Sequence, residues 1–168
     1  MTFPFEKLTT KAREAVASSQ QLAQSAGNPE VSPLHLLMAL LTERQGLTIP
    51  ILQKMGVPLD ALSQAVTAEL KRLPTSSNSS VRGLGSQMVQ VLNQAQQWAD
   101  QLQDEFISTE HLLMSLTKVD STAKTILQTQ AVTESDLREA IKSIRGSAKV
   151  TDQDPESKFQ ALEKYGID

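Results

Sequence analysis

Apolar residues recur at intervals of three and four along most of the chain, a spacing that predicts amphipathic helices. The first is expected over residues 9 to 26, because Ala12, Val16 and Ala23 fall on one face of such a helix. Gly27 follows directly, and glycine often ends a helix because it adopts a left-handed backbone readily. The opening of the chain therefore predicts a helix with one face buried.

Three more helices are expected before the middle of the chain. One opens at Ser32, whose hydroxyl can cap free backbone N–H groups, with Pro33 at the first helical position, where its missing N–H costs nothing. Another covers about 48 to 55 and stops at Gly56, and the last follows Val57-Pro58 and ends at Arg72. The first part of the chain thus reads as a four-helix unit.

The second part repeats this plan. Helices are expected over 86 to 103, 108 to 118, 121 to 130 and 134 to 145, with Ser108 in the capping place of Ser32. VSPLHLLMALL at 31 to 41 returns as ISTEHLLMSLT at 107 to 117. The predicted fold class is all-α, with eight helices arranged as a pseudo-twofold duplication of a four-helix motif.

A constant offset supports duplication more strongly than likeness alone. At a shift of 76, matched pairs include Leu8 with Leu84, Ala23 with Ala99, and His35 with His111. At a shift of 75, later pairs include Ile51 with Ile126, Leu62 with Leu137, and Val66 with Ile141. We assign repeat one to 8–73, a surface loop to 74–85 and repeat two to 86–146, together forming a unit over 1–146.

Residues 147–168 are expected to lie outside the duplicated unit. The segment 146 to 157 is polar, and it precedes a short pattern in which Phe159, Leu162 and Tyr165 share one helical face. We predict a linker here, followed by a face that has nothing in this chain to pack on and that begins another module.

Composition narrows the functional classes. The 168 residues are 39% hydrophobic and 4% aromatic, which favours closely packed helices, and the chain has no cysteine. Its net charge of -3 comes from interspersed acids and bases, so no basic footprint points to nucleic acid. No segment has the length of a membrane span or the order of a signal peptide. We expect a cytoplasmic protein that binds neither nucleic acid nor membrane.

Motifs for chemistry are missing from the sequence. It contains no phosphate-binding glycine loop and no nucleophile elbow, so no catalytic residue is assigned. His35 and His111 lie at matching places in different repeats, without the spacing or further ligands that zinc requires. We therefore expect no metal and no cofactor in this chain, and interpret both histidines as hydrogen-bonded helix residues.

The most interesting remaining residues are polar groups at helix starts beside apolar surface. Thr9 begins the first helix, and Asp104, Glu105 and Glu110 surround the start of the sixth. Ordinary capping explains such residues well. Two repeats packed about a twofold would also leave a seam between their first helices. Lined by apolar side chains and edged by these polar groups, that seam would suit an extended peptide.

The sequence resembles the amino-terminal domains of Clp proteins, and most specifically those of the ClpB family of AAA+ disaggregases. The repeated motif fits any Clp amino-terminal domain, whereas KRLP at 71 to 74 and ALEKYGID at 161 to 168 point to the ClpB family. The resemblance covers essentially the whole chain. It implies that two ATPase modules and a coiled coil, absent here, supply ATP and Mg²⁺ chemistry, so this chain itself is expected not to be an enzyme.

The resemblance also implies a function and a site. The domain is expected to engage unfolded or aggregated polypeptides, in a full-length homohexamer that cooperates with a DnaK-type chaperone, while the isolated domain is monomeric. Its substrate-binding residues correspond to a polar group of Thr9, Asp104 and Glu110 and to an apolar groove near Val16, Leu92 and Leu112.

Two features of the sequence leave alternatives open. Phe3 and Phe5 extend the chain before the matched region and leave the edge of the groove undefined. The alternative function is that of an adaptor-docking or substrate-docking domain of a ClpA- or ClpC-type unfoldase. A freestanding enzyme is a third hypothesis, disfavoured by the missing catalytic groups.

Overall fold

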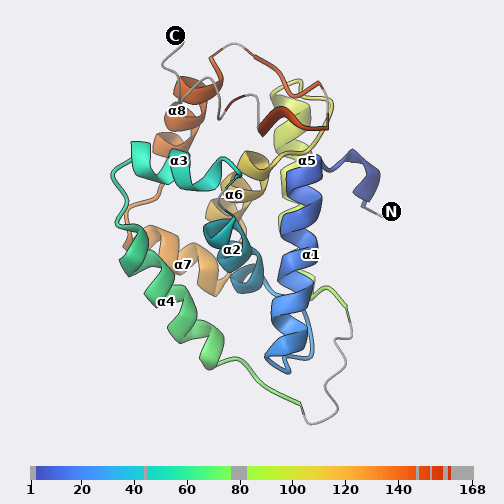
Figure 1. Cartoon of the computed structure of the whole chain (residues 1–168), viewed down its shortest axis with the longest axis vertical. Helices are drawn as coiled ribbons and strands as arrows, with labels where there is room; N and C mark the ends of the chain where they lie inside the picture. Colours follow the sequence, from blue (N-terminus) through green and yellow to red (C-terminus); the bar gives the residue numbers. More distant parts are fainter. Residues whose placement is uncertain are drawn as a thin grey trace.

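The computed structural model describes residues 3–43, 45–76, 83–146, 148–151, 153–156 and 159. In these residues the chain forms one short 3-10 helix, η1, and eight α-helices (Figure 1). Their bounds are η1 Phe5–Lys7, α1 Thr10–Ser25, α2 Pro33–Thr42, α3 Thr48–Lys54, α4 Leu59–Lys71, α5 Ser86–Gln101, α6 Thr109–Lys118, α7 Thr122–Thr129 and α8 Glu134–Arg145. The all-α fold class is confirmed, and the expected helix ends agree to within two residues.

The twofold relation is visible in how the helices pack. Helix α1 packs on α2 as α5 packs on α6, and α2 contacts α4 as α6 contacts α8. The third helices exchange partners, because α3 packs on α8 of the other repeat while α7 packs on α4. The two repeats are therefore interlocked through one shared core.

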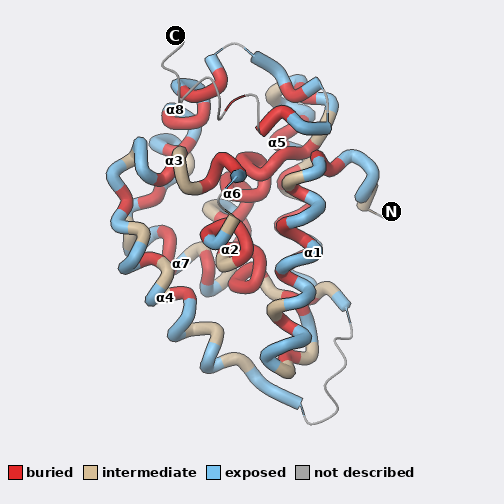
Figure 2. The backbone as a smooth tube through the Cα atoms, in the orientation of Figure 1, coloured by how far each residue is buried: buried red, intermediate tan, exposed pale blue. Residues whose placement is uncertain are grey.

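The second helices of the two repeats, α2 and α6, form the centre of the molecule. The sequence analysis expected the repeats to meet at a seam between their first helices. Nearly all residues of α2 and α6 are buried, and the two helices contact each other in the middle of the fold (Figure 2). Helix α2 is almost wholly apolar, so it must be surrounded by other elements, and α6 is buried although it carries several polar side chains. Helices α1 and α5 keep one exposed polar face, so they lie on the outside and pack mainly on the second helices.

Two short parallel β-bridges join the repeats near the starts of these helices. Leu8 pairs with Ile107, and Leu84 pairs with Val31, so the second bridge is the twofold mate of the first at the offset of 76. The matching hydrogen bonds run from the Ile107 N–H to Lys7 O at 2.7 Å and from the Val31 N–H to Gly83 O at 3.0 Å. Each bridge fixes the chain entering one first helix against the chain entering the other repeat's second helix.

The repeated histidines help to cap the N-terminal ends of α2 and α6. The backbone N–H of Ser32 donates to His35 Nδ1 at 2.9 Å, and that of Ser108 donates to His111 Nδ1 at the same distance. Both serine–histidine pairs form capping boxes at the starts of α2 and α6. An N–H can only donate, so Nδ1 carries no proton and each ring is neutral with its proton on Nε2. The sequence motif is thus repeated because the same cap is built twice.

One expectation about the end of the chain is wrong. Phe159 was predicted to lie on a face with nothing to pack on, but it is 1% exposed and belongs to the core cluster, together with Val150. The Arg145 guanidinium of α8 lies 5.5 Å from the centroid of the Phe159 ring. Leu162 and Tyr165 lie outside the described residues, as do residues 77–82 of the central loop. None of the described helices combines the length and the apolar content needed to cross a membrane.

Candidate functional site

The two repeats differ in their buried polar residues around the N-terminal ends of α1 and α6. Three polar residues there match residues without an ionisable side chain or without any side chain, in the pairs Thr9 and Gly85, Asp104 and Asn28, and Glu110 and Leu34. All three polar residues are buried. Duplication explains what the repeats share, so the differences indicate where one repeat acquired a separate role.

Asp104 is the best-connected of the three. Its Oδ1 accepts hydrogen bonds from Arg145 Nη2 at 2.6 Å and from the Val150 N–H at 2.8 Å, and its Oδ2 accepts from His111 Nε2 at 2.8 Å. Because His111 is neutral, Arg145 supplies the opposite charge. In the other repeat, Asn28 accepts the equivalent bond from His35 without any charge.

The surroundings of Asp104 keep it ionised. Burial by itself raises the pKa of this carboxyl group, but hydrogen bonds from His111, Arg145 and the Val150 amide, with the charge of Arg145, outweigh burial and lower the pKa to about 2. Asp104 is therefore an anion at any pH near neutrality, and its carboxylate fixes Arg145 and the backbone at Val150.

Glu110 lies on the other side of Arg145. Its Oε2 is 3.4 Å from Arg145 Nη1, an ion pair without hydrogen-bond geometry, and the residue is 0% exposed. Among the described residues, neither carboxylate oxygen of Glu110 has a hydrogen-bond partner. A buried carboxylate without hydrogen bonds is energetically costly, which marks this position for explanation.

Glu156 completes the cluster from the C-terminal segment. Its Oε2 accepts hydrogen bonds from the Thr9 hydroxyl at 2.6 Å and from the Thr109 N–H at 3.1 Å. Thr9 also caps α1, because its hydroxyl accepts from the Ala12 N–H at 3.1 Å. The carboxyl group of Glu156 thus lies between the N-terminal ends of two helices.

The pKa of Glu156 moves in the opposite direction to that of Asp104. Burial, followed by the nearby charge of Glu110, raises the pKa of Glu156 to about 7, although hydrogen bonds from Thr9 and Thr109 act in the lowering direction. Glu156 therefore exchanges a proton near neutral pH. We name the five side chains Thr9, Asp104, Glu110, Arg145 and Glu156 the polar cluster.

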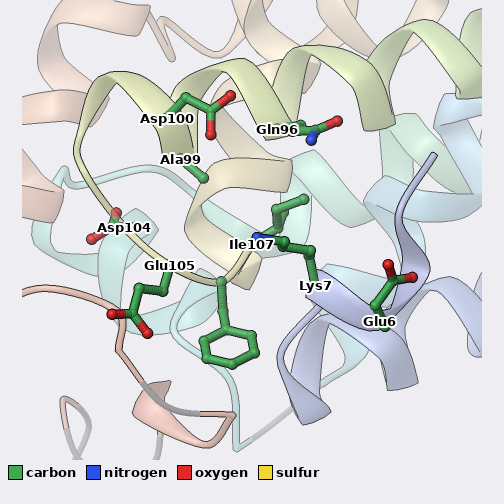
Figure 3. A pocket seen from close by; sticks show the side chains of 9 residues that line it. Glu6, Lys7, Gln96, Ala99, Asp100, Asp104, Glu105 and Ile107 are labelled. Carbon is green, nitrogen blue, oxygen red and sulfur yellow. The ribbon is translucent and has the colours of Figure 1, made fainter. Parts of the chain in front are cut away.

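A groove of about 380 Å³ opens beside the polar cluster, between η1 and α5 (Figure 3). It is lined by Glu6, Lys7, Gln96, Ala99, Asp100, Asp104, Glu105, Phe106 and Ile107. Figure 3 shows Gln96, Ala99 and Asp100 along α5 on one side and Glu6 with Lys7 on the other. Ala99, Phe106 and Ile107 give it apolar surface, and the carboxylates of Glu6, Asp100 and Glu105 against one lysine make its rim acidic.

The structure agrees with the predicted positions of some site residues and not with those of others. The structure brings Thr9, Asp104 and Glu110 together, as expected, but Thr9 and Glu110 are enclosed where an open polar edge was predicted. Val16, Leu92 and Leu112 belong to the core cluster, and Leu92 is only 1% exposed. The expectation that these three line an open groove is therefore corrected, because α1, α5 and α6 use them to pack on one another. Their role in binding stays a prediction.

Two members of the polar cluster were missed from the sequence. Arg145 lies in the last turn of a helix, where lysine and arginine are common and usually solvated, so the sequence analysis did not single it out. Its signal was its place beside Ile144 on the apolar side of α8, where the first repeat has Leu70 at the offset of 75. Glu156 offered no signal of its own, because it lies in a polar segment far along the chain from Thr9.

The extension before the matched region lies next to the groove. The rings of Phe3 and Phe5 pack edge to face with centroids 4.9 Å apart. Phe5 is one of the exposed large hydrophobic residues, at 40%.

No group of three His, Cys, Asp or Glu side chains able to hold a metal is found in the part of the chain that the structure describes.

The duplicated eight-helix fold, with its repeated serine–histidine cap, is that of a known class of protein domain. The Clp repeat N-terminal domain family matches residues 7–130 and 84–161, so the two matches together cover nearly the whole chain. The chain belongs to this family.

Its curated relatives are ClpB chaperones. The chain is 44% identical over 168 residues to the chaperone protein ClpB of Rhodopirellula baltica, and 40% identical over 161 residues to that of Mycobacterium tuberculosis. These alignments cover 100% and 95% of this chain but only 19% of each relative. The chain thus spans about a fifth of the length of these chaperones.

Solved structures agree on the fold. The N-terminal domain of Hsp104 from Candida albicans matches with a TM-score of 0.79 at 20% identity, over 90% of this chain and 99% of that one. A ClpV N-domain solved in complex with a VipB peptide matches with a TM-score of 0.69 at 17% identity, over 88% and 94%. The ClpD N-terminal domain of Arabidopsis thaliana matches at 0.61 and 23% identity, over 84% and 96%.

Proposed function

We propose that this chain is the substrate-binding N-terminal domain of a ClpB-type disaggregase, and that it engages unfolded or aggregated polypeptide through the groove between η1 and α5. The observation that carries the proposal is the position of this groove, directly beside the polar cluster, where the two repeats carry different buried polar residues. That a ClpV N-domain of similar fold was solved with a bound peptide supports a peptide-binding role. In the full-length protein, ATP hydrolysis, hexamer formation and cooperation with a DnaK-type chaperone belong to other modules.

The composition of the groove indicates the kind of segment it takes. Ala99, Phe106 and Ile107 offer apolar contact, and the rim carries Glu6, Asp100 and Glu105 against the single cation of Lys7. Apolar contacts supply binding free energy, and complementary charge favours encounter with basic partners. The proposed clients are exposed apolar segments flanked by lysine or arginine. These features are common in unfolded chains and are buried or dispersed in folded ones.

Phe106→Ser tests the groove. Phe106 and Met55 are both partly buried and pack on the core cluster, but only Phe106 lines the groove. We expect Phe106→Ser to weaken binding of a fluorescent, reduced and carboxymethylated model protein about tenfold, because one apolar contact is typically worth 1–2 kcal/mol. Met55→Ser serves as the matched control and should leave the affinity unchanged.

The outcomes separate the proposed function from its alternative. Equal weakening by Phe106→Ser and Met55→Ser would place client binding elsewhere. Tight binding of a folded adaptor, with no binding of unfolded protein by the parent, would favour the docking domain of a ClpA- or ClpC-type unfoldase.

A further inference from the structure

The C-terminal segment contacts the polar cluster with two side chains three residues apart. Glu156 places its carboxyl group against the Thr9 hydroxyl and the Thr109 N–H. Phe159 is buried, and the Arg145 guanidinium lies 5.5 Å from the centroid of its ring. In Figure 1 this segment, drawn in red, crosses the end of the molecule where α1 begins.

The contacted surface has the features of a receptor for a carboxyl group. Thr109 is the first residue of α6, so its N–H has no acceptor within the helix and points outward. Helix N-termini favour acidic groups through these free N–H groups and the helix dipole. Thr9 adds a hydroxyl donor from the start of α1. Without Glu156, both donors would lose this acceptor.

A second observation is that the docked segment leaves buried acceptors of the site without hydrogen bonds. Glu110 is enclosed, and neither of its oxygens is hydrogen-bonded among the described residues. The second oxygen of Glu156, Oε1, is buried and likewise lacks a described partner. A proton on Glu156 reduces the repulsion between the two carboxyl groups and so favours the segment's docked position.

We propose that Glu156 and Phe159 are a built-in ligand of this site, and that the site also takes, in exchange for them, a client segment carrying a carboxyl group followed three residues later by an aromatic ring. This inference rests on the proposed function, and it adds a second subsite to the groove. The occupied form hides Thr9 and Glu110, and the exchanged form leaves the C-terminal segment free.

The charges around Glu156 make the exchange depend on pH. The charge that acts on Glu156 is that of Glu110 on α6, and α1 contributes the Thr9 hydroxyl. Glu110 in turn pairs with Arg145 on α8, which also pairs with Asp104. The docked pKa of Glu156, about 7, lies above its ordinary value of 4.5, so docking takes up a proton. Docking is then strongest below pH 4.5 and weakens as the pH rises through 7, by a factor on the order of 10².

Two backbone amides report the docking directly. The Thr109 N–H donates to Glu156, and the Thr10 N–H, at the first position of α1, donates to Gln153 O at 2.8 Å. Both amides are therefore protected from hydrogen exchange by the C-terminal segment rather than by a helix. We expect their protection to fall on the order of 10²-fold between pH 5 and pH 8, while the helical amide of Leu113 changes little.

Two variants at one position should act in opposite directions. Glu156→Gln keeps an acceptor for Thr9 and Thr109, has no charge to repel Glu110 and can donate an N–H to it. We expect it to hold the segment tightly at every pH. Glu156→Ala removes the acceptor, so both amides should lose protection already at pH 5. A merely structural role would make both variants lose stability without this split.

Exchange is measured with a fluorescein-labelled peptide of the sequence of residues 153–161, at pH 6. We expect Glu156→Ala to bind it at least tenfold more tightly than the parent, and Glu156→Gln more weakly. Peptides with alanine at the positions of Glu156 or Phe159 are the controls and should bind poorly.

Two results would overturn the inference: full protection of Thr10 and Thr109 in Glu156→Ala, or equal affinity of the parent and both variants for the peptide. The carboxymethylated model protein is titrated in parallel. If it binds in a Phe106-dependent way while the peptide does not exchange, this inference fails and the proposed function stands. If the peptide exchanges but the model protein never binds, the proposed function fails.

Discussion

Replacing Asp104 by asparagine removes one charge from the middle of the polar cluster while keeping the shape of the side chain. Asp104 accepts from three donors: Arg145, His111 and the Val150 N–H. The amide of asparagine offers one oxygen and one NH₂ group, so one of its positions must face a donor. His111 cannot adapt by moving its proton, because its Nδ1 already accepts from the Ser108 N–H.

The magnitude follows from two separate considerations. Breaking a buried ion pair by removing one partner typically costs 3–5 kcal/mol, and here Glu110 remains beside Arg145 and reduces the cost. The pKa of Asp104 gives an independent figure. A shift from 3.8 to about 2 corresponds to about 2 kcal/mol of stability at neutral pH. We expect Asp104→Asn to lower the free energy of unfolding by about 3 kcal/mol.

The pH dependence has a definite sign. The folded pKa of Asp104 is lowered, so its contribution is fully present above the unfolded value of 3.8 and is lost as the pH falls toward 2. Urea unfolding of the parent and of Asp104→Asn, followed by circular dichroism, should therefore show a constant difference from pH 7 to pH 5. That difference should narrow by about 2 kcal/mol between pH 4 and pH 2.

Asp100→Asn is the matched control, because it makes the same chemical change at an exposed position of α5. It should change the free energy of unfolding by less than about 0.5 kcal/mol. The reasoning is refuted if Asp104→Asn is as stable as Asp100→Asn at pH 7, or if its deficit is the same at pH 7 and pH 2.5. The first result would mean that Glu110 alone balances Arg145, and the second would mean that the deficit does not come from the charge of Asp104.

Three further predictions concern the core, the caps and the histidines. Leu92→Ala should destabilise the protein by about 2–5 kcal/mol, as much as Leu36→Ala, because both side chains are buried. If Leu92→Ala lowered the melting temperature much less than Leu36→Ala, the groove first expected at Leu92 would be favoured again. Thr133→Ala, which removes a cap on the Asp136 N–H, should cost about 1 kcal/mol, and Thr9→Ala should cost more in the same urea titration because it also loses Glu156. Zinc chelators should leave the melting temperature unchanged, and a clear decrease would assign metal to His35 and His111.

The fold could be predicted from the sequence because its causes are local. Helix period, Ser32 and Ser108 as caps, and Gly27 and Gly56 as stops all act within a few residues, so they can be read without knowing what lies nearby. The duplication added long-range information, since one offset relates the two halves. The duplication nevertheless led to a wrong prediction of which helices meet at the centre of the fold. The pattern of apolar residues does not say which apolar face packs on which.

The burial of Leu92 illustrates this limit. Its place on an apolar stripe of α5 is compatible with either a groove or a core, and only the packing of α5 on α6 decides for the core. Phe159 shows the opposite error. The sequence analysis predicted that its apolar face has nothing to pack on, whereas the fold places the core beside it.

The sequence alone determined the eight helices, their caps, their duplication and the three polar residues worth attention. Only the tertiary structure decided that those residues form one buried cluster, because Arg145 and Glu156 reach Asp104 and Thr9 across 41 and 147 positions of sequence. The states of the two acids, one fixed as an anion and one exchanging its proton near neutrality, also depend on neighbours that only folding supplies. The free energy of a charge is set by what surrounds it in space, and the order of residues along the chain does not contain that information in any local form.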